Sequence, residues 1–216
     1  MKTILCYGDS NTWGYNPITE ARYPLEQRWV TLLGRDLGPD YLVIPEGLNG
    51  RTTVWPDPVT GKYKSGKRTL IPILESHHPL DLVVLMLGTN DLKHRFGLSA
   101  WDIASSAQTL VEMIQGSTFG PDGRGPRVLL IAPPPTCVPG TRFGEMFAGA
   151  DEKSQHLARY FKQVADELRC GFLDAGQHVV SSKVDGIHLD AGELPKLAAA
   201  VAASIRQMLS IRQMLK

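Results

Sequence analysis

Short apolar runs alternate with amphipathic stretches along most of the chain. The apolar runs predict strands at residues 3–7, 41–44, 80–87, 128–132 and 172–173. Residues 80–87 are almost continuously apolar, which is typical of a central parallel strand that is covered on both faces. The sequence therefore predicts a sheet whose strands are separated by longer connections.

The amphipathic stretches predict helices between these strands. Their expected ranges are 26–37, 69–77, 101–114, 151–168 and 194–209. The first range carries apolar residues at Trp29, Val30, Leu33 and Leu37, and Gly38 follows it as a stop signal. Pro72 is expected in the first turn of the helix at 69–77, where a missing N–H costs little. Residues 51–68 and 136–150 are expected to be loops.

This alternation indicates an α/β protein with right-handed crossovers. The simplest arrangement is a three-layer α/β/α sandwich around a flavodoxin-like, five-stranded parallel sheet in the order 2-1-3-4-5. Residues 1–209 are expected to form a single domain, and residues 210–216 a duplicated extension.

The extension repeats the hexapeptide that precedes it, because residues 204–209 and 210–215 have the same sequence. Six residues advance a helix by about 240° beyond a full turn. The second copy therefore cannot continue the buried stripe of the first, and we expect it to fray or to pack on a neighbour.

Composition and charge exclude several classes of protein. The chain has 216 residues, of which 43% are hydrophobic, and a net charge of +1. This balance gives no electrostatic reason to expect nucleic acid or an anionic membrane as a partner. No apolar run approaches the roughly 20 residues of a membrane span. Since Met1 and Lys2 lead directly into a strand with no signal peptide, we expect a cytoplasmic protein.

Three cysteines, Cys6, Cys137 and Cys170, are widely spaced and form no C-x-x-C motif. A disulfide framework or a zinc site is therefore not expected. Cys6 is interpreted as a small buried hydrophobic residue. A cysteine nucleophile stays as a minor alternative, because no histidine is near Cys137 or Cys170 in the sequence.

The first strand ends abruptly in Gly8, Asp9 and Ser10. Ligands bind at the carboxyl ends of strands in open α/β sheets, so a serine there is a candidate nucleophile. The alternative is that Asp9 and Ser10 only cap a turn or a helix.

Three further segments should meet this serine at the same edge of the sheet: residues 46–50, 88–91 and 184–188. Within the last of them, His188 can act as the base that a serine nucleophile needs. A tight turn at Gly186 would let the Asp185 carboxylate hold the other ring nitrogen of His188. The alternative for His188 is an ordinary surface loop residue.

Acyl transfer also requires donors that stabilise an oxyanion. The candidates are the backbone N–H groups of Ser10 and Gly47 and the side-chain amide of Asn90. The alternatives are a turn glycine at position 47 and an Asx-turn or helix cap at Asn90.

These four segments resemble the four sequence blocks of the SGNH hydrolases, also called the GDSL family. The family's serine, glycine, asparagine and histidine match Ser10, Gly47, Asn90 and His188, and the resemblance spans almost the whole chain. Residues 46–48, followed by residues 51–53, resemble the short arylesterase and acyltransferase branch, and some relatives of similar size deacetylate sugars. The resemblance departs at Asn11, where the GDSL pattern has leucine, and this affects the expected substrate fit.

The resemblance implies ester hydrolysis through an acyl-enzyme on Ser10, with no metal and no cofactor. The expected substrates are short-chain aryl esters or acetylated carbohydrates, with acyl transfer to alcohols or peroxide in competition with water. Relatives in this branch form dimers or octamers, so a homo-oligomer is expected. The expected substrate-binding residues are Asn11, Trp13, Trp55, Pro134, Val138, Phe143, Phe147 and Ile187.

Three other classes of protein fit these motifs less well. A flavodoxin-like nucleotide- or flavin-binding module is the main alternative, but the chain lacks a G-x-G-x-x-G or Gly-Lys-Ser/Thr motif after its first strand. A metallophosphoesterase would need Asp9, Asn90, Asp91 and His188 as ligands, without the Asp-x-His or His-x-His pairs that usually accompany them. An α/β-hydrolase is excluded by the absence of G-x-S-x-G.

Overall fold

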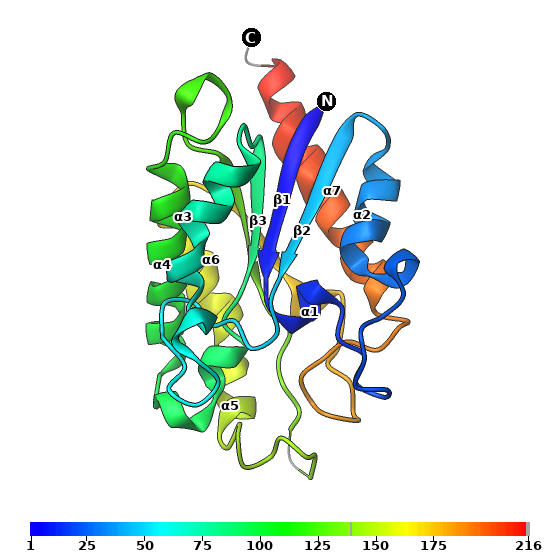
Figure 1. The fold of residues 1–216 in the computed structure, drawn as a ribbon, viewed down its shortest axis with the longest axis vertical. Coiled ribbons are helices and arrows are strands. Elements are labelled where there is room, and N and C mark those ends of the chain that lie inside the picture. The colour runs from blue at the N-terminus through cyan, green and yellow to red at the C-terminus, as the bar shows by residue number, and fades with distance from the viewer. Residues whose placement is uncertain (139, 215–216) are drawn as a thin grey trace.

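A parallel sheet of five strands forms the centre of the protein (Figure 1), as seen in a computed structural model that describes residues 1–138 and 140–214, with side chains through residue 209. The strand order is β2-β1-β3-β4-β5, and every neighbouring pair is parallel. The strands are β1 (Lys2–Gly8), β2 (Tyr41–Gly47), β3 (Leu82–Met86), β4 (Arg127–Ala132) and β5 (Gly171–Asp174). The predicted fold class and strand order are confirmed.

Alternate side chains of β1 enter two separate cores, because successive residues of a strand point to opposite faces of the sheet. Ile4 and Cys6 pack in one core with α2 (Trp29–Leu37) and α7 (Leu194–Met214). Leu5 and Tyr7 pack in the other core, whose helices are α3 (Gly66–His77), α4 (Ala100–Gln115) and α6 (Leu157–Glu167). Figure 1 shows these two helical layers on either side of the sheet.

The prediction of a helix at 26–37 is wrong for the first turn. A separate 3₁₀ helix covers Leu25–Gln27, and α2 begins only at Trp29. Arg28 between them is extended, with ψ 135°, and its Nε donates to the Tyr23 carbonyl at 2.8 Å. This contact with a preceding loop residue is not visible in the helical pattern.

The prediction for Pro72 is also wrong, because α3 begins three residues earlier than expected, at Gly66. Pro72 therefore lies in the helix interior instead of the first turn. The N–H groups of Gly66 and Lys67 donate to the carbonyls of Thr52 and Thr53, at 3.1 and 3.0 Å. These tertiary hydrogen bonds satisfy amides that a helix N-terminus leaves unpaired and so extend the helix backwards.

The single helix predicted at 151–168 is two helices, α5 (Ala150–Ser154) and α6. The Ser154 hydroxyl accepts the Thr136 N–H at 3.0 Å and donates to the Asp151 carbonyl at 2.8 Å. The turn between the helices is thus attached to the segment that follows β4, which the helical periodicity could not reveal.

Element ends differ more modestly elsewhere. The strand expected at 80–87 is shorter, whereas the strand expected at 41–44 continues to Gly47. The strand expected at 172–173 gains one residue at each end. The last helix, expected to end at residue 209, continues to Met214 and so includes most of the repeated hexapeptide. The packing of the second copy lies outside the described side chains and stays a prediction.

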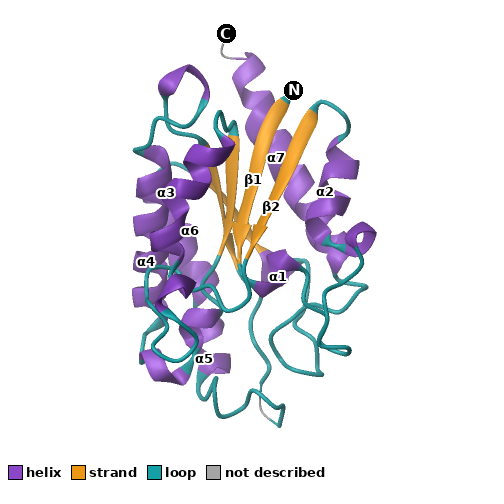
Figure 2. Ribbon diagram, viewed as in Figure 1, coloured by secondary structure: helices purple, strands orange, loops and turns teal. Residues whose placement is uncertain are grey.

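The strand register brings the predicted site segments to one end of the sheet. Gly8, at the end of β1, is level with Gly47 of β2 and Met86 of β3. Figure 2 shows the long loops gathered at this carboxyl end, next to the short helix α1 (Ser10–Trp13). Within the described residues, no helix has the length and apolar character needed to span a membrane.

Candidate active site

Ser10 lies at a sharp turn from β1 into α1. Asp9 caps this turn, because its Oδ1 accepts the Asn11 N–H at 3.0 Å and its carbonyl accepts the Trp13 N–H at 2.9 Å. At Gly8, a Cβ atom would lie 2.1 Å from the Thr12 hydroxyl, so any side chain there would collide with α1. The turn therefore needs glycine and places Ser10 at the carboxyl end of the strand.

The Ser10 hydroxyl contacts His188, which comes from the loop before α7. Ser10 Oγ and His188 Nε2 are 2.8 Å apart, although the two residues are separated by 178 positions in the chain. The other ring nitrogen, Nδ1, is 2.6 Å from Asp185 Oδ2. The structure thus places Ser10, His188 and Asp185 in one continuous hydrogen-bonded series.

The loop that carries Asp185 and His188 is tightly folded around the carboxylate. Asp185 Oδ1 accepts the backbone N–H groups of Ile187 and His188, both at 3.0 Å. Gly186 has φ +76°, and a Cβ atom there would lie 2.5 Å from the Cys137 carbonyl oxygen. Glycine at this position therefore allows both the left-handed turn and the close approach of the neighbouring segment.

Hydrogen bonding determines how this pair is protonated. Burial opposes ionisation of Asp185, but the hydrogen bonds and charge of His188 outweigh it, so the pKa of Asp185 lies below its usual value. An ionised carboxylate only accepts hydrogen bonds, so His188 Nδ1 must carry the proton. In the neutral ring Nε2 then has a free lone pair, which can accept the Ser10 O–H.

The predicted oxyanion donors lie beside this series. The Asn90 side chain donates from Nδ2 to the Arg51 carbonyl at 3.1 Å and lies 3.5 Å from Asp9 Oδ2. Gly47 packs directly against α1, since a Cβ atom there would lie 2.1 Å from the Trp13 nitrogen. A larger residue at position 47 would therefore displace α1, which begins with Ser10.

A buried carboxylate supports Asn90 from the next position. Asp91 is completely buried, and its two oxygens accept the Thr53 N–H at 3.1 and 3.0 Å. The Thr53 hydroxyl also donates to Asp91. Burial, together with the nearby charge of Asp9, raises the pKa of Asp91 to about 6 in spite of the hydrogen bonds from Thr53.

Three residues of the site were missed by sequence reasoning. The Arg51 guanidinium donates to the carbonyls of Gly8 and Glu46 and lies 4.1 Å from the centre of the Tyr7 ring. The Tyr15 ring lies 4.1 Å from the His188 ring, and Arg142 contacts both Tyr15 and Asp185. Arg51 is part of the motif at 51–53, but no local signal distinguishes Tyr15 or Arg142.

The predicted substrate-binding residues differ in their contacts and in their exposure to solvent. Asn11 is buried, and its Nδ2 donates to the Ile187 carbonyl at 3.3 Å. The Phe143 ring lies 6.3 Å from His188 and 6.2 Å from Phe147. Trp55 instead donates to Ser106 on α4 at 3.0 Å. The other members differ in exposure: Trp13 is partly buried, and Pro134, Val138, Phe147 and Ile187 are buried.

None of the three cysteines is suited to act as a nucleophile. Burial raises the pKa of Cys6 far above its usual value and that of Cys170 to about 11. Burial and nearby carboxylates also raise the pKa of Cys137. Because the thiolate is the reactive form, these shifts disfavour the cysteine alternative.

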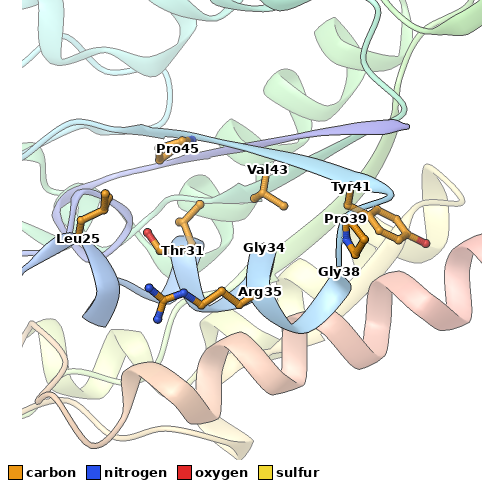
Figure 3. Close-up of a pocket in the computed structure, with 10 residues that line it drawn as sticks. Leu25, Thr31, Gly34, Arg35, Gly38, Pro39, Tyr41, Val43 and Pro45 are labelled. Carbon is orange, nitrogen blue, oxygen red and sulfur yellow. The ribbon is translucent and has the colours of Figure 1, made fainter.

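A separate hollow lies away from Ser10, between α2 and the edge strand β2 (Figure 3). It has a volume of about 600 Å³, and no residue predicted for the active site lines it. Among the described residues, no group of three His, Cys, Asp or Glu side chains is placed to hold a metal ion.

Comparison with known proteins gives the family. The GDSL-like Lipase/Acylhydrolase family matches residues 6–192. The chain therefore belongs to this family and is a carboxylic ester hydrolase. A search of curated proteins found no significant match.

Solved structures with a similar fold include esterases of two kinds. A carbohydrate acetylesterase family member from Sinorhizobium meliloti is 41% identical, with a TM-score of 0.92 over 97% of this chain and 100% of that one. Est24, a carbohydrate acetylesterase from the same organism, is 38% identical, with a TM-score of 0.91 over 96% and 100%. The native aryl esterase of M. smegmatis is 38% identical, with a TM-score of 0.90 over 96% and 99%.

Proposed function

We propose that this protein is a serine esterase that hydrolyses short-chain carboxylic esters through an acyl-enzyme on Ser10. The observation that carries this proposal is the 2.8 Å contact between Ser10 Oγ and His188 Nε2, with Asp185 at the opposite ring nitrogen. A serine hydroxyl is a weak nucleophile unless an adjacent base removes its proton. The distances from His188 to Ser10 and Asp185 support the roles of base and orienting group that we propose for His188 and Asp185.

In the first step, Ser10 Oγ attacks the ester carbonyl while His188 Nε2 takes the hydroxyl proton. Asp185 stabilises the imidazolium that forms, because its carboxylate accepts the Nδ1–H. The tetrahedral intermediate collapses when His188 returns the proton to the departing alcohol. The product of this step is the acyl ester of Ser10.

The negative charge of the intermediate is stabilised by the Ser10 N–H, the Gly47 N–H and the Asn90 amide. An amide nitrogen carries two hydrogens, and the Arg51 carbonyl takes one from Asn90. The contact with Asp9 is long, at 3.5 Å, so the second hydrogen can turn toward an oxyanion.

In the second step, water attacks the acyl ester while His188 Nε2 takes its proton. The bond between the acyl carbon and Ser10 Oγ then breaks, the carboxylic acid leaves, and His188 returns the proton to Ser10 Oγ. An alcohol or peroxide in place of water would give acyl transfer by the same proton movements. The substrates that we propose are aryl esters or acetylated carbohydrates, and the names of the similar structures support both classes. Phe143, which lies near His188, and Phe147, which packs against Phe143, support a preference for short acyl groups.

The assembly and location of the protein remain proposals from the sequence. We propose a homo-oligomer, a dimer or an octamer, in the cytoplasm. Trp55, Val59 and Tyr63 are exposed in the 51–68 segment and offer apolar surface for such an assembly.

The decisive experiment is hydrolysis of p-nitrophenyl acetate by the wild type and by Ser10→Ala, with a chelator present. We expect the variant to lose at least about 10⁴-fold in kcat. Ser117→Ala is the matched control, since the Ser117 hydroxyl bonds the Ile114 carbonyl at the end of α4, and it should keep full activity.

Mass spectrometry after treatment with a serine-directed organophosphate completes this test. One adduct on Ser10 is expected in the wild type and none in Ser10→Ala. Activity that survives in Ser10→Ala would overturn the proposal. Faster hydrolysis of a long-chain ester than of the acetate would overturn the preference for short acyl groups.

A further inference from the structure

Arg142 joins three segments around the imidazole of His188. Its Nη2 donates to the Tyr15 hydroxyl at 2.9 Å, and the same nitrogen lies 3.9 Å from Asp185 Oδ2. Its guanidinium lies 4.9 Å from the centre of the Phe143 ring, and it also pairs with Glu20. One side chain from the 136–150 segment thus contacts the loop after α1 and the loop that carries His188.

The aromatic partners of Arg142 are also the aromatic neighbours of His188. The Tyr15 ring lies 4.1 Å from the imidazole with an angle of 32° between the planes, and Phe143 approaches at 6.3 Å with an angle of 65°. Tyr15 is further fixed by its N–H, which donates to the Ser10 carbonyl at 3.0 Å. Arg142 therefore orders the two rings that border the base.

The charge of Arg142 acts on the same carboxylate oxygen that accepts the His188 Nδ1–H. A cation beside this oxygen competes with the imidazolium for the carboxylate charge and also repels the imidazolium directly. Arg142 is about one-third exposed, so solvent weakens these effects without removing them.

Other charged or titratable groups also surround this pair, and they come from several elements. Asp9, in the turn before α1, interacts electrostatically with His188. Tyr23, before α2, and Cys137, after β4, both lie in the field of Asp185. Asp190 acts in turn on Tyr23 and Cys137, and Lys183 and Asp151 act on Cys137. The Asp9 carboxylate attracts the imidazolium, so Arg142 acts against it.

We propose that Arg142 is a positioning residue for the reaction, which holds Tyr15 against His188 and favours the neutral imidazole through its charge next to Asp185. This inference rests on the proposed function, because it assigns a consequence to His188 acting as a base. The proposal requires that removing the charge of Arg142 keep His188 in the imidazolium form up to a higher pH. The neutral base that attack by Ser10 needs would then be available over a narrower range.

The test compares the dependence of kcat/KM on pH for the wild type, Arg142→Met and Arg142→Lys with p-nitrophenyl acetate. In Arg142→Met we expect the acidic limb of the profile to move to higher pH by roughly 0.5 to 1 unit. Arg142→Lys keeps the positive charge but lacks the planar guanidinium that contacts Tyr15 and Phe143. It should therefore return the acidic limb toward that of the wild type, while kcat is lowered in both variants because neither keeps the guanidinium that holds Tyr15.

The matched control is Arg159→Met, because Arg159 on α6 also lies over an aromatic ring, that of Tyr160, at 5.5 Å. Its profile should equal that of the wild type. A second measurement uses the wild type alone: raising the salt from about 0.05 M to about 1 M should move its acidic limb in the direction seen for Arg142→Met, since salt screens an exposed charge.

An acidic limb that stays in place in Arg142→Met would overturn the inference, as would an equal shift in Arg142→Lys. If Arg142→Met does not fold, an absence of any salt effect in the wild type would overturn it. Failure of the proposed function has a different signature. Activity in Ser10→Ala, or an organophosphate adduct elsewhere than on Ser10, would remove the role of His188 itself.

Discussion

The part of the site that holds His188 and the part that holds Asn90 are supported by contacts of different range. Asp185 and His188 are three residues apart in one loop, and the turn at Gly186 brings them together. Asn90 is supported instead through Asp91, which bonds Thr53, a residue 38 positions earlier. The first arrangement is built within a single loop, whereas the second requires two distant segments to fold together.

The region of Asn90 also contains two buried carboxylates with opposite properties. Asp57 and Asp91 have no exposed surface. Burial opposes ionisation of Asp57, but hydrogen bonds from Thr60 and Val59 and the charge of Lys93 lower its pKa to about 2. Burial and the like charge of Asp9 oppose ionisation of Asp91, the hydrogen bonds from uncharged Thr53 do not outweigh them, and its pKa rises to about 6.

The difference between Asp57 and Asp91 shows that burial alone does not determine the charge of a carboxylate. The charged and hydrogen-bonding partners decide the direction in which the pKa moves. It also predicts that the two parts of the site respond to different changes. Alterations near His188 should affect the chemical step, whereas alterations around Asn90 should affect both the chemical step and folding.

The largest expected effect comes from removing the base. His188→Ala should lose at least about 10⁴-fold in kcat, because Ser10 then has no group to accept its proton. Its melting temperature should change little, since the Asp185 contacts to the backbone of the loop remain. Steady-state kinetics and thermal unfolding measure the two quantities.

His178→Ala is the control for this prediction, because His178 is exposed and lies outside the site. It should behave as the wild type in both measurements. A large fall in the melting temperature of His188→Ala would show that the His188 loop is needed for folding, and the contrast between the two parts of the site would fail.

A smaller effect is expected from the predicted oxyanion donor. Asn90→Ala should lower kcat by about 10²–10³-fold, which is the usual cost of one lost donor. KM should change much less, because the donor acts mainly on the charge of the transition state. Steady-state kinetics with p-nitrophenyl acetate measures kcat and KM separately and so checks this expectation.

Asn16→Ala provides the matched control, since the Asn16 side chain accepts the amides of Ile18 and Thr19 in an exposed loop. If Asn90→Ala raises KM and leaves kcat intact, Asn90 contributes to substrate binding and the oxyanion role is wrong.

The smallest expected effect is on the pH dependence of folding. Because the pKa of Asp91 in the folded protein is about 6, above the ordinary 3.8, the folded state keeps a proton that the unfolded chain releases. Stability should therefore fall as the pH rises from about 4 to about 6, by on the order of 3 kcal/mol. Asp91→Asn should remove this fall, as measured by chemical denaturation at both pH values.

Asp57→Asn is the paired variant, and Asp57 affects the pH dependence of stability with the opposite sign. The pKa of Asp57 lies below its ordinary value, so its contribution to stability is present above about pH 4 and is lost as the pH falls toward about 2. Asp57→Asn should remove the dependence of stability on pH in that lower range only. Identical slopes between pH 4 and 6 in the wild type and Asp91→Asn would contradict the difference drawn between the two carboxylates.

The sheet, its strand order and the segments that meet at its edge could be predicted from the sequence. Hydrophobic runs and helical periods depend on near neighbours in the chain, and the parallel topology then brings the strand ends together. Gly8 and Gly47 are level in the sheet for this reason. The pairing of Asp185 with His188 was also predictable, because both residues belong to one short loop.

The contacts between distant segments could not be predicted from the sequence. The backward extension of α3 to Gly66 depends on the carbonyls of Thr52 and Thr53, and the division of residues 151–168 into two helices depends on Thr136. Arg142 reaches Tyr15 across 127 residues, and no periodic pattern or motif records such a pair. These contacts join groups that are far apart in the sequence, and so they follow from packing in three dimensions.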